Sequence, residues 1–311
     1  MIYLGKGDIE QLLDPEDLIV ELERAFVALS NGEVSAPPRI AATARGAGTL
    51  LAMPGFVDGV LATKLVTIFP GNDHGAGFPS HQALIALFDP EDGTPIAVLD
   101  GSHITAMRTA VTSALAARLV ARADARSLLV IGAGVQGRAH AEIFRQLLDL
   151  DEVVIVSRND NAARALAESL GVQHATSIEE AVRAADIVCA CTHAESPVLR
   201  RDWLRPGVHI NSVGASDGRE LDDATIGAGL LVVESRVAFS PYPAGARDLE
   251  NVDPAAAAEL GEIISGRHPG RTSADEITVF KSVGHAIEDA VAAALVLRLA
   301  ERDSRGTFIA R

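Results

Sequence analysis

The segment from Leu128 to Gly137 constrains the fold more than any other part of the chain. It reads Leu-Leu-Val-Ile-Gly-Ala-Gly-Val-Gln-Gly, so an apolar run passes directly into a G-x-G-x-x-G motif. The apolar run predicts a buried strand and the following residues open a helix, which is the context that this motif requires. We expect Gly132 to make the tight turn, Gly134 to admit a pyrophosphate to the backbone, and Gly137 to let the helix pack on the strand. The sequence therefore predicts a Rossmann dinucleotide-binding domain that begins near Ser127.

Beyond this motif the chain alternates between strand and helix patterns. Strands are predicted at 127–132, 152–157, 186–191, 207–213 and 229–234, and helices at 135–149, 160–170, 177–184 and 222–227. Such alternation is typical of a parallel sheet with helices on both faces. Val135 and Gln136 begin the first of these helices, so their backbone N–H groups are expected to point at the cofactor phosphates.

The residues before the motif predict a different kind of domain. A helix is expected over 8–30 with a break near Pro15, strands over 49–53 and 61–69, and a hairpin of strands 83–88 and 95–99 around the turn sequence Asp89–Gly93. A long helix over 103–122 follows, and the tail predicts an amphipathic helix over Ala286–Arg302 that packs back on this first domain and carries little chemistry. The expected fold is thus α/β, with a doubly wound Rossmann domain at 123–283. The second, α+β antiparallel-sheet domain comprises 1–122 and 284–311.

Composition narrows the possible partners. The 311 residues suit two domains, and 48% hydrophobic with 22% charged residues allows a large core. A formal net charge of -15 argues against nucleic acid, because phosphate backbones need a basic face, although a small anion needs only a few local cations. The N-terminus does not resemble a signal peptide and no apolar run suits a membrane span, so we expect a soluble cytoplasmic protein. The only cysteines, Cys189 and Cys191, are expected to be buried, and no metal site is predicted.

The end of the second Rossmann strand bears on the choice of cofactor. An NAD enzyme usually has Asp or Glu here to bind the ribose 2′-hydroxyl, whereas this chain has Ser157 followed by Arg158. A hydroxyl and a guanidinium suit a 2′-phosphate, so NADP(H) is the preferred cofactor and NAD(H) remains possible. The alternative is that Arg158 is a solvated surface residue.

Three basic residues of the first domain lie in apolar surroundings. They are Arg39 after two prolines, Lys64 in a strand pattern and Arg108 in a helix pattern. Buried cations need an anionic partner, and a substrate carboxylate would provide one. Taken singly, each residue is more simply explained as an exposed or snorkelling side chain, so these residues alone leave the substrate open.

The chain as a whole resembles the ornithine cyclodeaminase / mu-crystallin family. The resemblance rests on these segments in this order: Pro37-Pro-Arg39, Met53-Pro-Gly55, Lys64-Leu-Val-Thr-Ile-Phe-Pro-Gly71, Leu87-Phe-Asp-Pro-Glu-Asp-Gly93, Thr105-Ala-Met-Arg-Thr109, Ile131-Gly-Ala-Gly-Val-Gln136 and Val279-Phe-Lys-Ser-Val-Gly284. This family joins a substrate-binding and dimerisation domain to a Rossmann domain. Its members include ornithine and lysine cyclodeaminases, alanine dehydrogenases, and reductases of ketimines and of pyrroline-2-carboxylate.

The resemblance also implies roles for individual residues. Arg39, Lys64 and Arg108 would bind the substrate carboxylate, and Lys64 would also polarise the carbonyl or imine. The cofactor would be contacted by Thr109 near its phosphates and by Thr192, Val213 and Ser282 on the nicotinamide side. These assignments are what the family resemblance implies and do not follow from composition or spacing.

Two departures from the family pattern bear on the reaction. Family cyclodeaminases carry a Glu two residues before the Met-Pro pair, where this chain has Leu51. They also carry a catalytic Asp after a Gly-Gly or Gly-Ala pair, where this chain has Gly214-Ala-Ser216-Asp217 in a loop two residues shorter than usual. The aligned residue is Ser216, and either Asp217 supplies the base or it is a turn former beside Gly218.

Three functions remain open at this point. The first is an NAD(P)-dependent oxidoreductase acting at the α-carbon of a small amino or imino acid, and the second is ornithine cyclodeaminase, which forms proline and ammonia. The third is a binding protein that holds NADPH and a small ligand without turnover. Apolar strands and an apolar tail helix also predict a homodimer.

Overall fold

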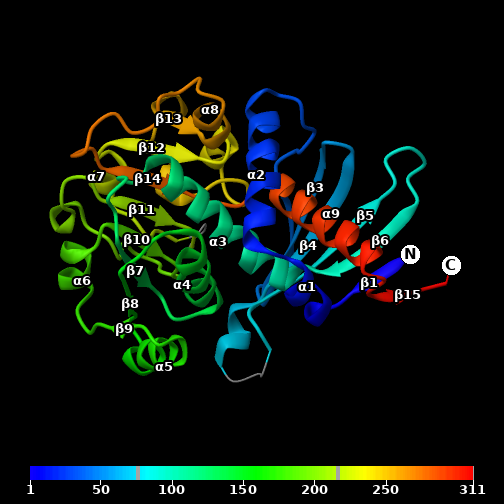
Figure 1. Ribbon diagram of the computed structural model, residues 1–311, viewed down its shortest axis with the longest axis horizontal. Helices are drawn as coiled ribbons and strands as arrows, with labels where there is room; N and C mark the ends of the chain where they lie inside the picture. The colour runs from blue at the N-terminus through cyan, green and yellow to red at the C-terminus, as the bar shows by residue number, and fades with distance from the viewer. Residues whose placement is uncertain (75–77, 215–217, 311) are drawn as a thin grey trace. The chain divides into compact units, whose positions relative to one another are not determined.

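The computed structural model describes residues 1–74, 78–214 and 218–310, and its elements are drawn in Figure 1. The chain forms two compact units, Met1–Arg108 with His285–Arg311, and Thr109–Gly284. The first unit is discontinuous because the tail of the chain returns to it, as the sequence predicts.

The first unit ends at Arg108, inside helix α3 (Gly101–Val120), and not at residue 122 where we expected the boundary. The reason is that the second half of α3 packs on the Rossmann unit. The Ser113 hydroxyl lies 3.0 Å from His140 Nε2, and Arg118 donates to the carbonyl of Leu147 over 3.1 and 2.7 Å. One predicted helix therefore contributes residues to both units.

The first unit contains a seven-stranded sheet with the order β15-β1-β6-β5-β4-β3-β2. Its strands are β1 (Ile2–Leu4), β2 (Ile40–Ala44), β3 (Gly48–Val57), β4 (Val60–Ile68), β5 (His81–Phe88), β6 (Pro95–Asp100) and β15 (Thr307–Phe308). The predicted hairpin is β5 with β6. All neighbouring strands pair antiparallel except β1 and β6, which are parallel, so the sheet is mixed where we expected an antiparallel one.

Two N-terminal helices and the tail helix cover this sheet. They are α1 (Lys6–Leu12), α2 (Pro15–Ser30) and α9 (Ala286–Arg302), with a short 3-10 helix, η1, at Pro70–His74. The break near Pro15 is confirmed: the Asp14 carboxylate caps α2 by accepting from the backbone N–H of Glu16 at 2.8 Å, and proline occupies the first turn, where its missing N–H costs nothing. Helix α9 lies against β3, β4 and β5, and α2 packs on α9 (Figure 1).

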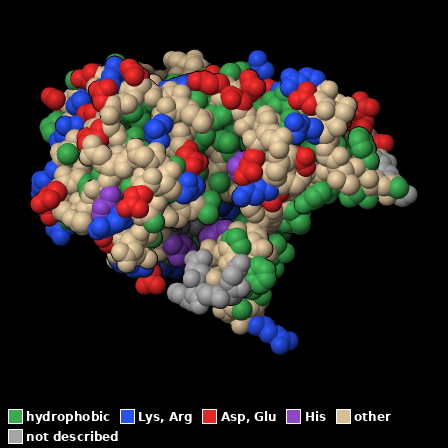
Figure 2. All heavy atoms as spheres, turned by 60° about the horizontal axis from the view of Figure 1, so that its bottom comes forward, with side chains coloured by type: hydrophobic (Ala, Val, Ile, Leu, Met, Phe, Trp, Pro, Cys, Tyr) green, Lys and Arg blue, Asp and Glu red, His purple; other side chains and the backbone are tan. Residues whose placement is uncertain are grey.

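The two faces of the sheet differ in what covers them. Alternate residues of a strand point to opposite faces. Leu51, Met53 and Val66 point inward and cluster with Ala286 of α9. The opposite face is also apolar, and the described residues leave much of it exposed: its large exposed side chains include Ile40, Leu50, Phe56 and Leu84. Hydrophobic side chains gather on the surface along the lower margin of the right-hand half of Figure 2.

The second unit contains an eight-stranded sheet in which every recorded pair is parallel. In the order β13-β12-β14-β11-β10-β7-β8-β9, the strands are Ala257–Glu259, Leu230–Val233, Thr278–Lys281, His209–Ser212, Ile187–Ala190, Ser127–Ile131, Glu152–Val156 and Gln173–His174. The chain runs outward from β7 in one direction through β8 and β9, then in the other through β10 and β11. This is the doubly wound topology that the sequence predicts, and it places the switch point between β7 and β10.

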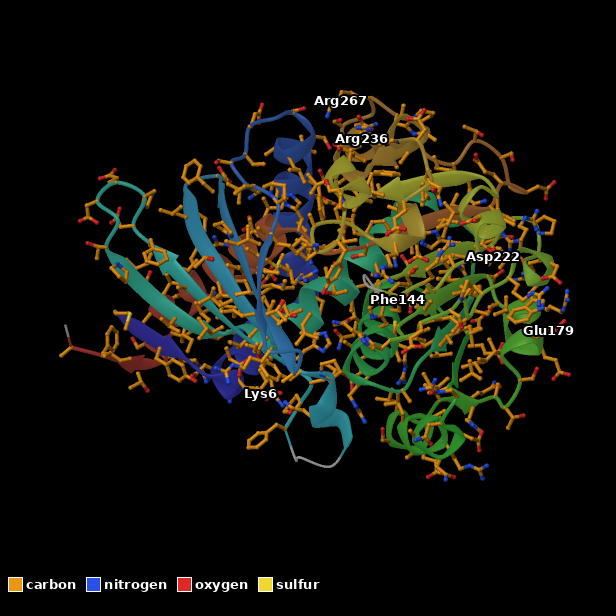
Figure 3. All side chains as sticks on the ribbon, turned by 180° about the vertical axis from the view of Figure 1, so that it is seen from behind. Lys6, Phe144, Glu179, Asp222, Arg236 and Arg267 are labelled. Atoms are coloured by element: carbon orange, nitrogen blue, oxygen red, sulfur yellow. The ribbon has the colours of Figure 1, made fainter. Side chains whose placement is uncertain are left out.

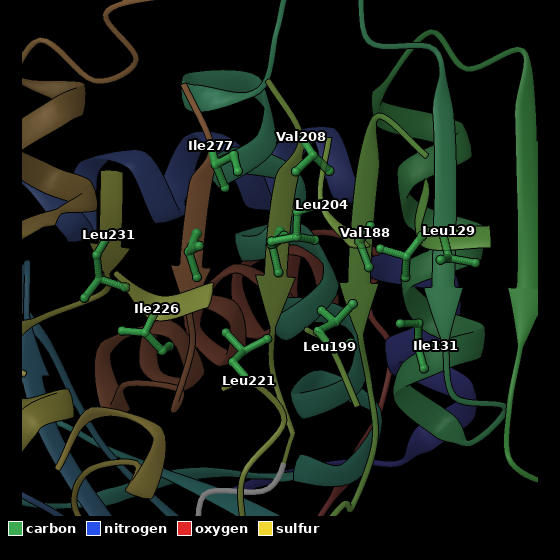
Figure 4. Packing of buried hydrophobic residues seen from close by; sticks show 14 of the residues in the cluster. Leu129, Ile131, Val188, Leu199, Leu204, Val208, Leu221, Ile226, Leu231 and Ile277 are labelled. Carbon is green, nitrogen blue, oxygen red and sulfur yellow. The ribbon is translucent and has the colours of Figure 1, made fainter. Parts of the chain in front are cut away.

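Helices cover both faces of the parallel sheet. They are α4 (Val135–Leu147), α5 (Asp160–Leu170), α6 (Ile178–Ala184), α7 (Asp223–Ile226) and α8 (Leu260–Ile264), with 3-10 helices η2 (Arg201–Trp203), η3 (Arg236–Phe239), η4 (Arg247–Leu249) and η5 (Pro254–Ala256). Val182 of α6 and Ile226 of α7 pack with Leu129, Val188 and other strand residues in one core cluster (Figure 4). On the edge near β13, Arg236 pairs with Glu262 of α8 at 2.8 Å, and Figure 3 shows Arg236 in that region.

Three short strands of the second unit, β9, β13 and β14, were not predicted from the sequence. Strand β13 has three residues, and β14 lies in the middle of the sheet between β12 and β11. The sequence of β14, Thr-Val-Phe-Lys, ends on a lysine that is fully buried, which is unusual for a central strand. Among the described residues, none of the helices combines the length and the apolar character needed to cross a bilayer.

Candidate functional site

The carboxyl ends of five parallel strands of the second unit lie in register. Ile131 of β7 pairs with Val156 of β8 and with Ala190 of β10; Ala190 pairs with Ser212 of β11, and Ser212 with Lys281 of β14. The residues that directly follow these strand ends therefore share one edge of the sheet. They include all the residues after Gly137 for which the sequence or the family resemblance predicts a cofactor contact: Ser157, Arg158, Thr192, Val213 and Ser282. Ligands of open α/β sheets bind at this edge, outside the carboxyl ends of the strands.

The glycine loop at the switch point has the geometry of a phosphate cradle. Gly132 has a φ of 120°, and a Cβ there would lie 2.4 Å from the carbonyl oxygen of Cys191. A Cβ on Gly137 would lie 2.0 Å from the carbonyl oxygen of Gly132, so the helix could not pack this closely with any other residue. A Cβ on Gly134 would meet no described atom within 4 Å, so the backbone there faces open space.

The N-terminus of helix α4 offers donors to a ligand at this cradle. Gly134 is its N-cap, and no side chain of the described residues caps it, so the N–H groups of the first turn point outward. A dinucleotide pyrophosphate, which accepts hydrogen bonds and is stabilised by the helix dipole, fits this arrangement. Gly132, Gly134, Val135, Gln136 and Gly137 all lie in it.

The residue that follows β8, at the position expected to contact the cofactor ribose, is Ser157 and not a carboxylate. Ser157 is half-buried and Arg158 is exposed. The Ser157 hydroxyl accepts from the backbone N–H of Asn159 at 3.3 Å, and the Asn159 side chain caps α5. The first acidic residue, Asp160, pairs with His174 at 2.8 Å and with Arg164 at 3.2 Å, and is therefore engaged within α5 and β9.

In the first unit, two of the predicted substrate-binding cations are buried together. Lys64 and Arg108 have exposed fractions of 3% and 5%. The Lys64 Nζ lies 2.7 Å from Asp289 Oδ2, and Arg108 Nε lies 3.1 Å from Asp289 Oδ1. Arg108 Nη1 also lies 3.2 Å from Glu288 Oε2, and Glu288 accepts from the backbone N–H of His285 at the start of α9. The expected association of Lys64 with Arg108 is present, and the acidic pair of α9 holds it.

Burial and the neighbouring charges lower the pKa of Lys64 to about 8. Desolvation is the largest cause, the Asp289 carboxylate opposes it, and the positive charges of Arg108 and Arg39 lower the pKa further. The third predicted cation, Arg39, thus acts electrostatically on Lys64 and is itself half-buried. Burial would raise the pKa of Asp289, but Lys64 and Arg108 outweigh burial and hold this pKa below its usual range.

The surroundings of Leu51 are apolar. Leu51 and Met53 are successive inward-pointing residues of β3, and Met53 is the register partner of Lys64. Leu51 packs with Met53, Val66 and Ala286, and Ile68 and Ala83 lie against this cluster. An ammonium group placed here would find no carboxylate within the cluster. Leu51 therefore lies in an apolar cluster that adjoins the cation Lys64.

The remaining predicted residues are placed as follows. Thr109 is buried in α3, at the first position of the second unit, and the Ser282 hydroxyl donates to the buried carboxylate of Glu234. Ser216 and Asp217 lie outside the described residues. In the described part of the chain, no group of three or more His, Cys, Asp or Glu residues is placed to hold a metal ion.

The expectation that the tail helix carries little chemistry is wrong. Glu288 and Asp289 lie in its first turn, and both are buried against cations. The sequence contained a signal for them, since two adjacent carboxylates in an otherwise apolar helix must either face solvent or pair with buried cations. Lys281 is a similar case, since a lysine within an apolar strand sequence also indicates a buried charge that needs a partner.

Comparison with known proteins agrees with this geometry. The sequence matches the model of the ornithine cyclodeaminase/mu-crystallin family over residues 3–303. It is 40% identical over 305 residues to the ketimine reductase mu-crystallin of Mus musculus, covering 94% of this chain and 96% of that protein.

Two solved structures have the same fold. One is the Δ1-pyrroline-2-carboxylate reductase of Thermococcus litoralis in complex with NADH and L-proline, with a TM-score of 0.93, 35% identity, and coverage of 99% of this chain and 100% of that chain. The other is an archaeal alanine dehydrogenase dimer with bound NAD, with a TM-score of 0.87, 30% identity, and coverage of 100% and 99%. The match runs through both units. The chain belongs to the ornithine cyclodeaminase/mu-crystallin family.

Proposed function

We propose that this protein is an NAD(P)-dependent reductase of small imino acids, which also acts as an amino-acid dehydrogenase in reverse. The observation that carries the proposal is the burial of Lys64 and Arg108 beside each other, with the positive charge of the half-buried Arg39 acting on Lys64, in a chain whose net charge is -15. Cations gathered in one buried place favour an anionic ligand. Relatives that reduce a ketimine or pyrroline-2-carboxylate, or oxidise alanine, act on small carboxylates of this kind.

In the proposed complex the substrate carboxylate binds among these cations. Arg108 would hold it in a fixed orientation, since a planar guanidinium can donate two parallel hydrogen bonds to a carboxylate. Lys64 would donate to the carboxylate or to the imine nitrogen. A pKa of about 8 suits a proton donor near neutral pH, because catalytic acids work best when their pKa lies near the working pH.

The cofactor would lie along the carboxyl edge of the parallel sheet, its phosphates at Gly132–Gly137 and at the start of α4. When bound, NAD(P)H supplies the hydride for the imine carbon. The proposed contacts of this chain are Thr109 on the phosphate side and Thr192, Val213 and Ser282 on the nicotinamide side. Ser157 and Arg158 favour NADP(H) over NAD(H), since a hydroxyl and a guanidinium can bind a 2′-phosphate.

Imine reduction is favoured over ornithine cyclisation because of Leu51. Cyclodeamination must hold a distal ammonium, and Leu51 lies in an apolar cluster with Met53, Val66 and Ala286. An unpaired charge in such surroundings is costly. A small or cyclic apolar side chain would instead gain from contact with this cluster.

The cofactor preference predicts the effect of one substitution. The wild type should bind NADPH at least tenfold more tightly than NADH, because one charge-assisted bond to phosphate contributes about 1.5–3 kcal/mol. Arg158→Asp should remove or reverse this difference, as followed by titration of the nicotinamide fluorescence. Arg164→Asp, on the exposed side of α5, is the control for a change of surface charge. Equal dissociation constants of the wild type for the two cofactors would contradict the preference.

The pKa of Lys64 predicts how carboxylate binding depends on pH. Lys64 carries its charge below pH 8 and loses it above, so the Kd for pyrrole-2-carboxylate, which stays a monoanion, should be flat below pH 8 and rise about tenfold per unit above it. Lys64→Arg stays charged and should abolish the rise. The measurement is isothermal titration at saturating cofactor from pH 6.5 to 9.5. A wild-type Kd that does not change between pH 8 and 9.5 would show that Lys64 does not hold the carboxylate.

The reaction type is tested by comparing two substrates. NADPH oxidation with pyrroline-2-carboxylate should be faster than proline and ammonia formation from L-ornithine with catalytic NAD(P)+. Leu51→Glu should raise ornithine turnover relative to Leu51→Gln, which has nearly the same shape without the charge, and circular dichroism would verify that both fold. If the wild type forms proline from ornithine faster than it reduces every imine tried, the protein is a cyclodeaminase, and Asp217 is then the leading candidate for its base.

The uncovered apolar face of the first sheet predicts a homodimer. Such a face on a soluble protein is usually covered by a symmetric partner, and the alanine dehydrogenase relative is a dimer. Sedimentation at micromolar concentration should give the mass of two chains. Leu84→Glu, in the middle of this face, should shift the equilibrium to monomer, whereas Val20→Glu on the exposed side of α2 should not. A monomeric wild type would rule the dimer out.

A further inference from the structure

A second buried charge cluster lies at the carboxyl edge of the parallel sheet, and the proposed reaction does not use it. Its centre is Glu220, which has no exposed surface. Glu220 Oε1 accepts from the backbone N–H of Thr192 at 2.7 Å and from its hydroxyl at 2.6 Å. Glu220 Oε2 accepts from the Ser212 hydroxyl at 2.8 Å and from the backbone N–H of Gly214 at 2.9 Å. One carboxylate thus joins the ends of β10 and β11.

Two of these four partners are backbone N–H groups, which can only donate, and the other two are hydroxyls within hydrogen-bond distance of the carboxylate. The fit is close, since a Cβ on Gly214 would lie 1.8 Å from the Thr192 carbonyl oxygen and 2.8 Å from Glu220 Oε1. Thr192 and Val213, which are proposed to line the nicotinamide, therefore take their positions from Glu220 and its partners. A side chain that holds two strand ends in this way is a positioning residue.

Two more charges complete the cluster. The ammonium of Lys281 lies 2.8 Å from Asp248 Oδ2 and donates to the Ser212 hydroxyl at 2.9 Å and to the Gly214 carbonyl at 3.0 Å. Asp248 Oδ1 accepts from the backbone N–H groups of Glu220 and Leu221, each at 3.2 Å. Two carboxylates and one ammonium are all fully or almost fully buried here, and the charge of the half-buried Arg219 also interacts with that of Asp248. Burial keeps the charge of the Glu220 carboxylate from being screened by salt.

The sign of this charge matters for a nicotinamide. The oxidised ring carries a positive charge and the reduced ring is neutral, so a fixed negative charge nearby stabilises only the oxidised form. We propose that Glu220 positions the nicotinamide-binding edge and that its negative charge favours the oxidised over the reduced form of the bound cofactor. This proposal rests on the proposed function. Its consequence is that bound NAD(P)H is a stronger hydride donor than free NAD(P)H, which suits a reductase.

The test measures binding and not turnover. For the cofactor pair that the wild type binds more tightly, the ratio of Kd for the oxidised form to Kd for the reduced form is compared between the wild type and Glu220→Gln. The ratio should rise about tenfold in Glu220→Gln, the size expected for losing one buried charge near the ring. If Glu220→Gln only shifted the residues that contact the nicotinamide, binding of the oxidised and of the reduced cofactor would weaken by the same factor, and the ratio would not change.

Asp186→Asn is the matched control. Asp186 lies next to the opposite end of the same strand, β10, and also accepts from backbone N–H groups, at Arg126 and Ser127. Its loss disturbs the strand but removes a charge far from the edge, so the ratio should stay within about twofold of the wild-type value. If Glu220→Gln does not fold, Asp248→Asn removes the other negative charge and should move the ratio in the same direction.

The outcomes separate this proposal from the one on which it rests. If the wild type binds neither cofactor pair, the proposed function fails. If the wild type binds a pair but the ratio stays within twofold in the folded variant, or rises equally in Asp186→Asn, the role of Glu220 is overturned and the proposed function stands.

Discussion

The pairing of Lys64 and Arg108 with the two carboxylates of α9 is the interaction on which the first unit depends. A sheet whose inner face carries a lysine cannot bury that face until the charge is balanced, because an unpaired buried ammonium is strongly destabilising. Asp289 provides this balance and packs α9 on β3, β4 and β5 in the same step. Stability and ligand affinity are thus connected, since the cations that a carboxylate would bind already stabilise the fold.

In the second unit, the register of the parallel sheet brings distant residues together. Because five parallel strands end in register, residues separated by more than a hundred positions in sequence lie along one edge of the sheet. The two units bury groups of opposite charge, the cations Lys64 and Arg108 in the first and the carboxylate of Glu220 in the second. A carboxylate ligand and a cationic ring require these two signs, and the strongly acidic surface provides neither in an unscreened form.

Much of the fold could be predicted from the sequence because its signals were local. The glycines after Leu128-Leu-Val-Ile131 determine a turn that no other residue fits, and Pro15 determines where α2 begins. The prediction failed where the deciding contacts are distant in sequence. Strand β14 ends on Lys281, and a charged residue argues against a central strand unless its partner is known; that partner, Asp248, is distant in the sequence. The same limit applies to the site: Lys64 and Arg108 could be named in advance, but their partners lie about 180 residues or more away in α9.

The late position of α9 in the chain also matters for synthesis on the ribosome. The Rossmann unit is continuous, from Thr109 to Gly284, and emerges complete before the last segment of the first unit has been made. Since domains tend to fold as they emerge, the middle of this protein can reach its native state while the sheet made before it still lacks its covering helix. During that interval the area of β3, β4 and β5 that α9 later covers is exposed together with Lys64, and exposed apolar surface of this kind favours binding by chaperones. Helix α9, which is synthesised after the Rossmann unit, is therefore needed for the strands synthesised before that unit to complete their fold.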